Sequence, residues 1–174
     1  SCKMVRASVT VCNPGAGNSN GGMPVSFYHG DPTTDPAAVL LHTGTFNQDI
    51  HEGDCKTFTY DIDLSNFNNL DIDLTIIIND NGSFVPGGVG HTVGTPFTLA
   101  SLATQGSTYK ECYYDNNLIT KTINVNNCPL VNLDPDNSSG ATGVNNYLNY
   151  YNAGSVTGAG IADADVAIVD PDAS

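Results

Sequence analysis

The chain has few basic residues and few strong helix formers. Five Lys and Arg stand against eighteen Asp and Glu in 174 residues, which gives a formal net charge of −13 at pH 7. Because phosphate groups are bound by basic patches, this balance argues against a nucleic acid partner and against an anionic membrane surface. Glutamate occurs only as Glu52 and Glu111, so few residues suited to exposed helix surfaces are present.

Membrane-spanning and catalytic signatures are also missing from the sequence. No apolar run reaches the roughly 18 residues that a transmembrane helix needs, so we expect no direct membrane insertion of this segment. No secretion signal is visible, and we expect an export signal and an anchor to lie outside this segment. No serine elbow, HExxH, P-loop or dinucleotide motif occurs, so we predict a non-enzymatic protein without catalytic residues.

Aspartate and asparagine are the abundant polar residues, with 16 and 20 copies. Several aspartates come in pairs separated by one residue, such as Asp134/Asp136 and Asp163/Asp165. Carboxylate and amide oxygens in loops are the ligands that Ca²⁺ prefers. The composition therefore predicts a β-rich, calcium-dependent extracellular module, and calcium is the cofactor that we expect.

Alternation of apolar and polar residues with a period of two predicts short strands and no helix. Six or seven strands within about 125 residues favour an all-β, immunoglobulin-like sandwich, although a jelly roll or a small barrel fits the same pattern. A long Gly-rich stretch covers residues 80–108. The expected strands are 5–12, 25–28, 39–41, 57–64, 70–78, a piece near Phe97 and Leu99, 109–114 and 119–125.

Five cysteines show neither a CxxC pair nor zinc-finger spacing, and scattered Cys in an acidic β chain fits an oxidising compartment. Cys12 and Cys55 each lie on the polar parity of an expected strand. If these strands are antiparallel neighbours, residue 12 falls opposite the start of the later strand. We therefore favour a Cys12–Cys55 disulfide on an outer face, among the many connectivities that five cysteines permit.

The composition changes after residue 127, so we expect one domain over 1–127 and a second segment over 128–174. Residues 129–174 contain six Asp and no Lys or Arg. A segment this short cannot bury the core of a sandwich alone. We expect a partial second β domain, a long appendage, or a piece that a neighbouring chain completes.

Three strings in order carry a resemblance to a known family: VTVCNPG at 9–15, PVSFYHGDP at 24–32 and ECYYDNN at 111–117. They resemble the CARDB-type, cell-adhesion-related immunoglobulin-like domains of bacterial surface proteins. NLDPDNSSGATG at 132–143 and IADADV at 161–166 look like the opening of a cadherin-like repeat, here incomplete, as in giant adhesins of gliding Bacteroidota exported by the type IX system. The resemblance implies a repeat protein of the cell surface, with calcium-stiffened joints.

The expected metal ligands lie in the second segment. Asp134, Asp136 and Ser138 have the spacing of a calcium loop, although Ser139 and Asn145 depart from the EF-hand pattern. Asp and Asn in turns also cap backbone groups, and a solvated acidic linker is the other interpretation. The remaining candidates flank a short apolar run and cannot all share one ion: Asp163, Asp165, Asp170 and Asp172.

Asp61/Asp63 and Asp71/Asp73 are a further pair of acidic clusters. If their strands are neighbours, the four carboxylates repel one another unless a cation, the strand twist or water relieves the repulsion. Calcium here is a weaker expectation than in the second segment.

Three functional hypotheses follow for this chain. The first is a structural and adhesive module of a long bacterial cell-surface or extracellular filament, with neighbouring repeats, surface polysaccharide or other cells as partners. The second is a carbohydrate-binding module that uses exposed tyrosines and the 80–108 stretch. The third is a self-assembling fibre subunit that a neighbour completes by strand addition. The sequence does not identify the ligand-binding residues.

Overall fold

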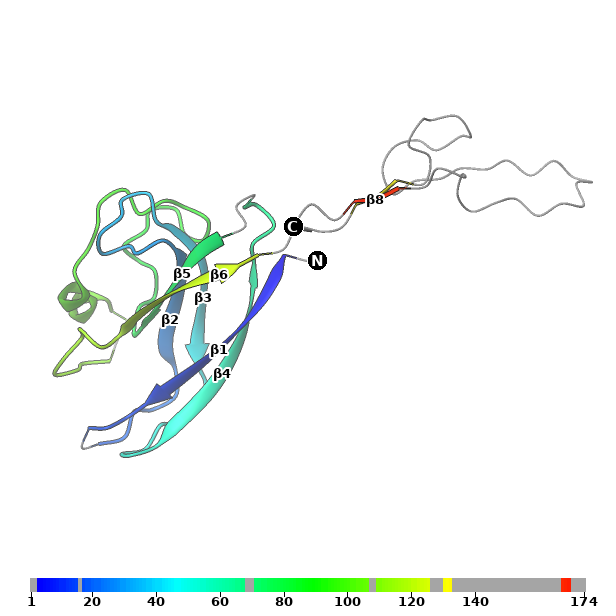
Figure 1. Ribbon diagram of the computed structural model, residues 1–174. Coiled ribbons are helices and arrows are strands. Elements are labelled where there is room, and N and C mark those ends of the chain that lie inside the picture. Colours follow the sequence, from blue (N-terminus) through cyan, green and yellow to red (C-terminus); the bar gives the residue numbers. More distant parts are fainter. Residues whose placement is uncertain are drawn as a thin grey trace, which may run out of the picture. The chain divides into compact units, whose positions relative to one another are not determined.

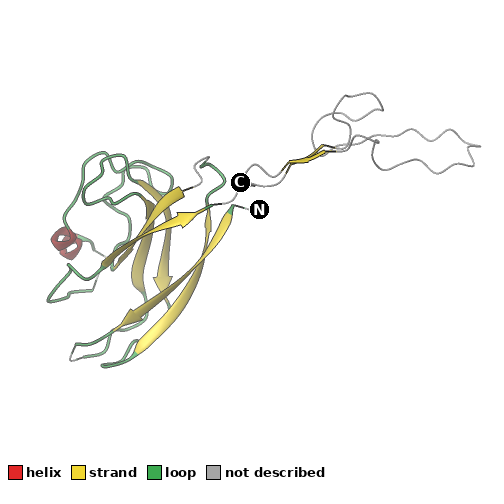
Figure 2. Ribbon diagram, in the orientation of Figure 1, coloured by secondary structure: helices red, strands yellow, loops and turns green. Residues whose placement is uncertain are grey.

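The computed structural model describes residues 3–15, 17–67, 71–106, 109–125, 130–132 and 167–169. Within these residues the chain is almost entirely β (Figure 2), which confirms the expected all-β class. The chain separates into two compact units, Lys3–Val125 and Asn126–Ser174. In the second unit the described strands β7 (Leu130–Asn132) and β8 (Ala167–Val169) pair antiparallel.

The first unit is a sandwich of two antiparallel sheets (Figure 1). One sheet has two strands and the other has four, in the order β3-β2-β5-β6. The two-stranded sheet pairs β1 (Met4–Cys12) with β4 (Cys55–Asp63). The four-stranded sheet contains β2 (Met23–His29), β3 (Val39–Phe46), β5 (Asp71–Ile78) and β6 (Leu118–Asn124).

The space between the two sheets holds a first hydrophobic core. Val9, Ile62 and Ile72 are buried there, while Arg6 and Asp61 stay exposed on the outer face. This burial confirms the inward parity that the sequence predicts for strands β1 and β4. Each sheet thus turns one apolar face inward, which drives the two sheets together.

A second core lies on the outer face of the four-stranded sheet, and the sequence did not predict it. The stretch after β5 folds back over this face, and Val85, Val93 and Leu102 pack there on Tyr28 and Ile77. Strand β2 is therefore buried along six consecutive residues, Met23–Tyr28, instead of alternating. A strand covered on both faces loses its polar parity because neither face meets water.

The strand expected near Phe97 and Leu99 is wrong. Leu99–Thr104 forms a short 3₁₀ helix, η1. Phe97 precedes this helix and stacks on Phe84 with ring centroids 4.7 Å apart. The alternation at Phe97 and Leu99 therefore reflects side chains that cover the second core, not a strand.

Candidate functional site

Cys12 and Cys55 are joined by a disulfide, as the sequence predicts. They are directly opposite in the β1–β4 ladder, with Cα atoms 4.0 Å apart, and both are exposed on the outer face. Of the other cysteines, Cys112 is an exposed free thiol. Cys2 and Cys128 lie outside the described residues.

The four strand aspartates do not form a common cluster, because β4 and β5 belong to different sheets. The expectation that their strands are neighbours is therefore wrong. Each carboxylate accepts hydrogen bonds inside the protein. Asp61 pairs with Arg6 at 2.7 Å, Asp63 accepts the Ser65 amide at 2.9 Å, Asp71 accepts Asn124 Nδ2 at 3.1 Å, and Asp73 accepts the Thr122 hydroxyl at 2.6 Å.

Two of these contacts lower the pKa of an exposed carboxyl group. The hydrogen bond from the Arg6 guanidinium lowers the pKa of Asp61, and hydrogen bonds from Ser65 lower the pKa of Asp63. Both side chains are screened by solvent, so these contacts contribute little to folding. They explain how the strand aspartates are accommodated without a shared ion.

The residues predicted to bind calcium lie outside the described residues: Asp134, Asp136, Ser138, Asp163, Asp165, Asp170 and Asp172. Within the described part of the chain, no group of three or more His, Cys, Asp or Glu side chains is arranged to hold a metal ion. The calcium hypothesis therefore concerns the second unit.

Asp80 is the acceptor at the centre of a fully buried polar cluster. Its carboxylate accepts hydrogen bonds from the Tyr28 hydroxyl at 2.5 Å and from Gln105 Nε2 at 2.7 Å. The Ser26 hydroxyl donates to the Asp80 carbonyl at 2.9 Å. Burial, followed by the neighbouring Asp80 carboxylate, raises the pKa of Tyr28. Because hydrogen-bond donors satisfy its oxygens, this buried carboxylate can link the loop that covers the sheet to strand β2.

Asn79 holds the segment that precedes β6, where the sequence predicted a strand over 109–114. That prediction is wrong. Asn79 lies at φ 62°, a left-handed conformation that Asn tolerates, and its side chain is buried. Its side-chain Nδ2 donates a hydrogen bond to the Tyr109 carbonyl at 2.6 Å, and its Oδ1 accepts one from the Tyr109 backbone N–H at 2.7 Å. A side chain thus replaces the backbone partner that a strand would have.

Glu111 extends this attachment. Its carboxylate accepts hydrogen bonds from Asn79 Nδ2 and from Asn117 Nδ2, the latter at 2.9 Å. Asn117 Nδ2 also donates to the Ile78 carbonyl at 3.2 Å. These bonds hold the 109–117 segment away from β1 and shape one wall of a groove.

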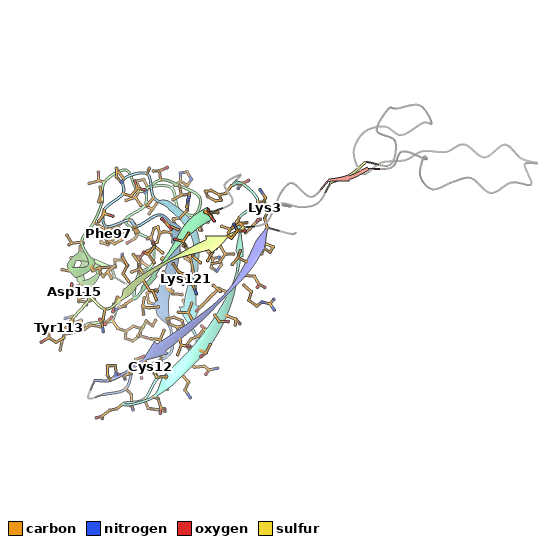
Figure 3. The ribbon with its side chains drawn as sticks, in the orientation of Figure 1. Lys3, Cys12, Phe97, Tyr113, Asp115 and Lys121 are labelled. Carbon is orange, nitrogen blue, oxygen red and sulfur yellow. A yellow bond between two sulfur atoms is a disulfide. The ribbon has the colours of Figure 1, made fainter. Side chains whose placement is uncertain are left out.

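This groove, with a volume of about 740 Å³, is the candidate site of the first unit. One wall is the end of β1 with the loop that follows it, and the other is the segment 109–119. Val9, Met23 and Ile78 contribute to its apolar lining. In Figure 3, Cys12 marks the β1 end of this region, and Tyr113 and Asp115 lie on the loop that leads to β6.

The side chain of Ile119 lies beside the groove in an unusual environment. Its partner across the ladder is Ile76, which packs on the first core, so Ile119 occupies the core-facing side of β6. Ile119 is nevertheless 62% exposed, whereas Ile123 on the same face packs on the core. Among the described residues, little therefore covers the core-facing side of β6 at Ile119.

The backbone beside the groove is unpaired on β1. Hydrogen-bonded and non-hydrogen-bonded pairs alternate in an antiparallel ladder. The Asn13 amide donates to the Asp54 carbonyl at 2.9 Å, so Thr10 and Cys12 fall in non-hydrogen-bonded pairs. Their amide and carbonyl groups point away from β4 and bond no other described backbone group.

The same reasoning applies to β6. The Ile78 amide donates to the Asn117 carbonyl at 2.8 Å, which places Leu118 and Thr120 in non-hydrogen-bonded pairs with β5. Their amide and carbonyl groups also point outward and bond no other backbone group in the described ranges. Two unpaired strand edges therefore border the sandwich at the groove.

The charged side chains that line the groove are Lys110 and Glu111. Two other cations of the first unit are engaged away from it: Lys3 donates to the Phe67 carbonyl at 2.7 Å, and Arg6 pairs with Asp61 at 2.7 Å on the outer face.

Comparison with known proteins yields no relative: no protein-family model, no curated protein and no solved structure matches this chain. The likeness to CARDB and cadherin-like domains therefore stays a prediction. Among the described residues, no helix has the length and apolarity needed to cross a bilayer. The sequence analysis did not identify the groove. The one signal for it in the sequence is that Ile119 lies on the side of the last expected strand that carries the apolar residues.

Proposed function

We propose that this chain is a non-enzymatic structural and adhesive module of a bacterial cell-surface or extracellular filament. The Cys12–Cys55 disulfide is the observation that carries the proposal. Thiols are kept reduced in most cytosols, whereas exported proteins retain disulfides. A bridge between two exposed cysteines at the end of a strand pair fits a protein that works outside the cell.

The architecture suits a scaffold. The four-stranded sheet packs on both faces, with one core between the sheets and another under the 80–105 stretch. The described strand carboxylates are engaged in internal hydrogen bonds, and the buried Asp80 is satisfied by Tyr28 and Gln105. Side chains that hold the fold together in this way support a mechanical role for the unit.

The location can be tested on cells that express the full protein. Protease treatment of intact cells should release peptides of this chain, and non-reducing peptide mapping should recover Cys12 linked to Cys55. A cytosolic protein used as a control should stay intact. Protection of this chain together with reduced Cys12 would contradict an extracellular role.

Calcium stiffening is a separate part of the proposal and concerns the second unit. Thermal melts of the full chain with calcium and with a chelator should differ, because a ligand that binds the folded state raises its stability. Replacing Asp134, Asp136, Asp163 and Asp165 by Asn should abolish the difference. Replacing the four strand aspartates Asp61, Asp63, Asp71 and Asp73 by Asn is the charge-matched control, since these carboxylates bond groups of the first unit. Identical melts of the parent chain would remove calcium from the proposal.

A carbohydrate-binding role is the second candidate, favoured by one residue. Tyr113 is 78% exposed and lines the groove, and exposed aromatic rings stack on sugars. A glycan array with the parent chain and Tyr113→Ala would test this role. Val89→Ala, at another exposed apolar side chain, serves as the control. Binding that Tyr113→Ala leaves unchanged would exclude this ring as a sugar platform.

A further inference from the structure

We propose that Cys2 and Cys128 form a second disulfide, which closes the first unit at the end where β1 begins and β6 ends. This inference rests on the proposed export of the chain, because a disulfide persists in an oxidising compartment. Both cysteines fall in the second compact unit and outside the described residues, and the described residues beside them fix where each chain end starts.

Strand β1 begins and strand β6 ends at the same end of the first unit (Figure 1). Met4 lies opposite Asp63, the last residue of β4, and Asn124 lies opposite Asp71, the first residue of β5. Because β5 follows β4 in the chain, the end of β4 and the start of β5 share one end of the sandwich. The first strand therefore begins where the last strand stops.

Contacts of Lys3 and Val125 place both chain ends at the edge of the first core. The Lys3 carbonyl accepts the Leu64 amide at 2.9 Å, and Lys3 Nζ donates to the Phe67 carbonyl at 2.7 Å. The Phe67 ring contacts the ring of His29 in the four-stranded sheet, with centroids 5.0 Å apart. Val125 is 3% exposed and belongs to the same core cluster as Leu64.

The remaining gap is within reach of the two cysteines. Cys2 directly precedes Lys3, and Cys128 follows Val125 by three residues. These four chain steps extend up to about 14 Å, and a disulfide joins Cα atoms about 4–7 Å apart. Because the two sheets of a sandwich stack about 10 Å apart, a bridge between residues 2 and 128 can span this end.

Cys112 is too far away to take the place of either partner. It is a free, exposed thiol on the segment that precedes β6, so the whole of β6 separates it from the end that Cys128 follows. An extended strand from Leu118 to Val125 rises about 23 Å, whereas three residues and a disulfide reach about 18 Å.

The cysteine count leaves one further pair. Cys12 and Cys55 bond each other and Cys112 is free, so Cys2 and Cys128 remain of the five cysteines. Their oxidation removes one electron and one proton from each thiol, and the new S–S bond joins the two sulfurs. A low-molecular-weight disulfide, such as oxidised glutathione, accepts the two electrons and becomes two thiols.

The bridge determines which part of the chain bears tension. Strands β1 to β6 all lie between residues 2 and 128. Force along the chain follows the shorter covalent path through the bond, so the hydrogen-bonded ladders of the first unit carry no load. In a filament, the first unit would then keep its fold under tension.

Peptide mapping of the monomeric full chain, recovered from expressing cells and alkylated without reduction, tests the bridge. Trypsin, which cleaves after Lys and Arg, gives four peptides that contain cysteine: 1–3, 7–56, 111–121 and 122–174. We expect peptide 1–3 joined to peptide 122–174, with Cys112 alkylated. Peptide 1–3 recovered in alkylated form, or joined to peptide 111–121, would overturn the inference.

Stretching single full chains by handles at their two ends tests the path of the force. In a chain that carries Cys12→Ser and Cys55→Ser, the further pair Cys2→Ser and Cys128→Ser should lengthen the stretched molecule by about 440 Å, because residues 2–128 then extend. Cys112→Ser in place of that further pair is the matched control and should leave the length unchanged. Equal lengths with and without the further pair would exclude the bridge.

Failure of this inference is distinguishable from failure of the proposed function. Alkylated Cys2 and Cys128 beside an intact Cys12–Cys55 bridge would remove the second disulfide and leave the surface location standing. Reduced Cys12 in a chain protected from external protease contradicts the surface location itself.

Discussion

The Tyr28 hydroxyl donates a 2.5 Å hydrogen bond to the Asp80 carboxylate, and both residues are fully buried although 52 positions separate them. Tyr28 belongs to β2 and Asp80 begins the stretch that covers the sheet. The bond therefore joins the second core to the strand beneath it. It also explains how an aspartate is tolerated at complete burial, since Gln105 and the Gly82 amide supply two further donors.

Tyr28→Phe should destabilise the unit by about 1–3 kcal/mol, because it leaves a buried carboxylate short of one donor. Urea unfolding followed by circular dichroism measures the change. Tyr60→Phe is the control, since the Tyr60 hydroxyl donates at 3.2 Å to the Thr45 carbonyl at an exposed site and its loss should cost less. Equal losses for the two variants would contradict the role assigned to Asp80.

Stability should fall at alkaline pH. Burial raises the pKa of Tyr28 above its ordinary value and that of Tyr60 to about 12. In the unfolded chain these phenols ionise near pH 10, while the folded state retains their protons. Stability present below pH 10 is therefore lost as the pH rises toward 12, by up to about 1.4 kcal/mol per pH unit for Tyr28.

Tyrosinate absorbance and circular dichroism, recorded together between pH 8 and pH 12, check this expectation. Tyr28→Phe, compared with its own stability at pH 8, should show a shallower decline. A decline of equal slope in parent and variant would show that other groups control alkaline unfolding.

Replacing both Cys12 and Cys55 by Ser should lower the free energy of unfolding by about 2–4 kcal/mol. The bridge spans 43 positions, so its loss releases a long loop in the unfolded chain. Guanidinium titration of the double variant measures the effect. Cys112→Ser, at the exposed free thiol, should leave the midpoint nearly unchanged.

Gly44→Ala should destabilise the sandwich by about 1–3 kcal/mol through overpacking. A Cβ atom at residue 44 would lie 2.5 Å from Cε1 of Tyr60. The Tyr60 ring also contacts Phe27, with centroids 5.0 Å apart, and has little room to move. Thermal melts compare it with Gly106→Ala, where no atom lies within 4 Å of the added methyl. A neutral Gly44→Ala would mean that β3 and β4 separate readily.

Asn79→Gly should loosen the segment 109–117 while keeping the left-handed backbone at residue 79. The change removes both hydrogen bonds to the Tyr109 backbone and the one to Glu111. Amide exchange in that segment should accelerate about tenfold or more, as expected for bonds of about 1–3 kcal/mol. Hydrogen exchange with mass spectrometry resolves the segment, and unchanged exchange there would contradict the role of Asn79.

The amino-acid sequence by itself determined the class of fold and one covalent link. Alternation at Val5–Val11 and Phe58–Leu64 revealed which faces of β1 and β4 turn inward, because side chains on a strand alternate regardless of distant contacts. The same parity placed Cys12 and Cys55 on the outer face and led to their pairing. Local periodicity is sufficient where one face of a strand meets water.

The tertiary structure alone decided the second core, the segment before β6 and the groove. The sequence places Tyr28 on the polar side of its strand, but in the structure the stretch after β5 covers this side chain. The sequence also predicts a strand at Tyr109, but the side chain of Asn79 bonds the Tyr109 backbone in place of a neighbouring strand. These features depend on contacts between residues far apart in sequence, which a period of two does not encode. The exposure of Ile119 likewise depends on the tertiary structure, because among the described strands β6 has a neighbour, β5, on one side only.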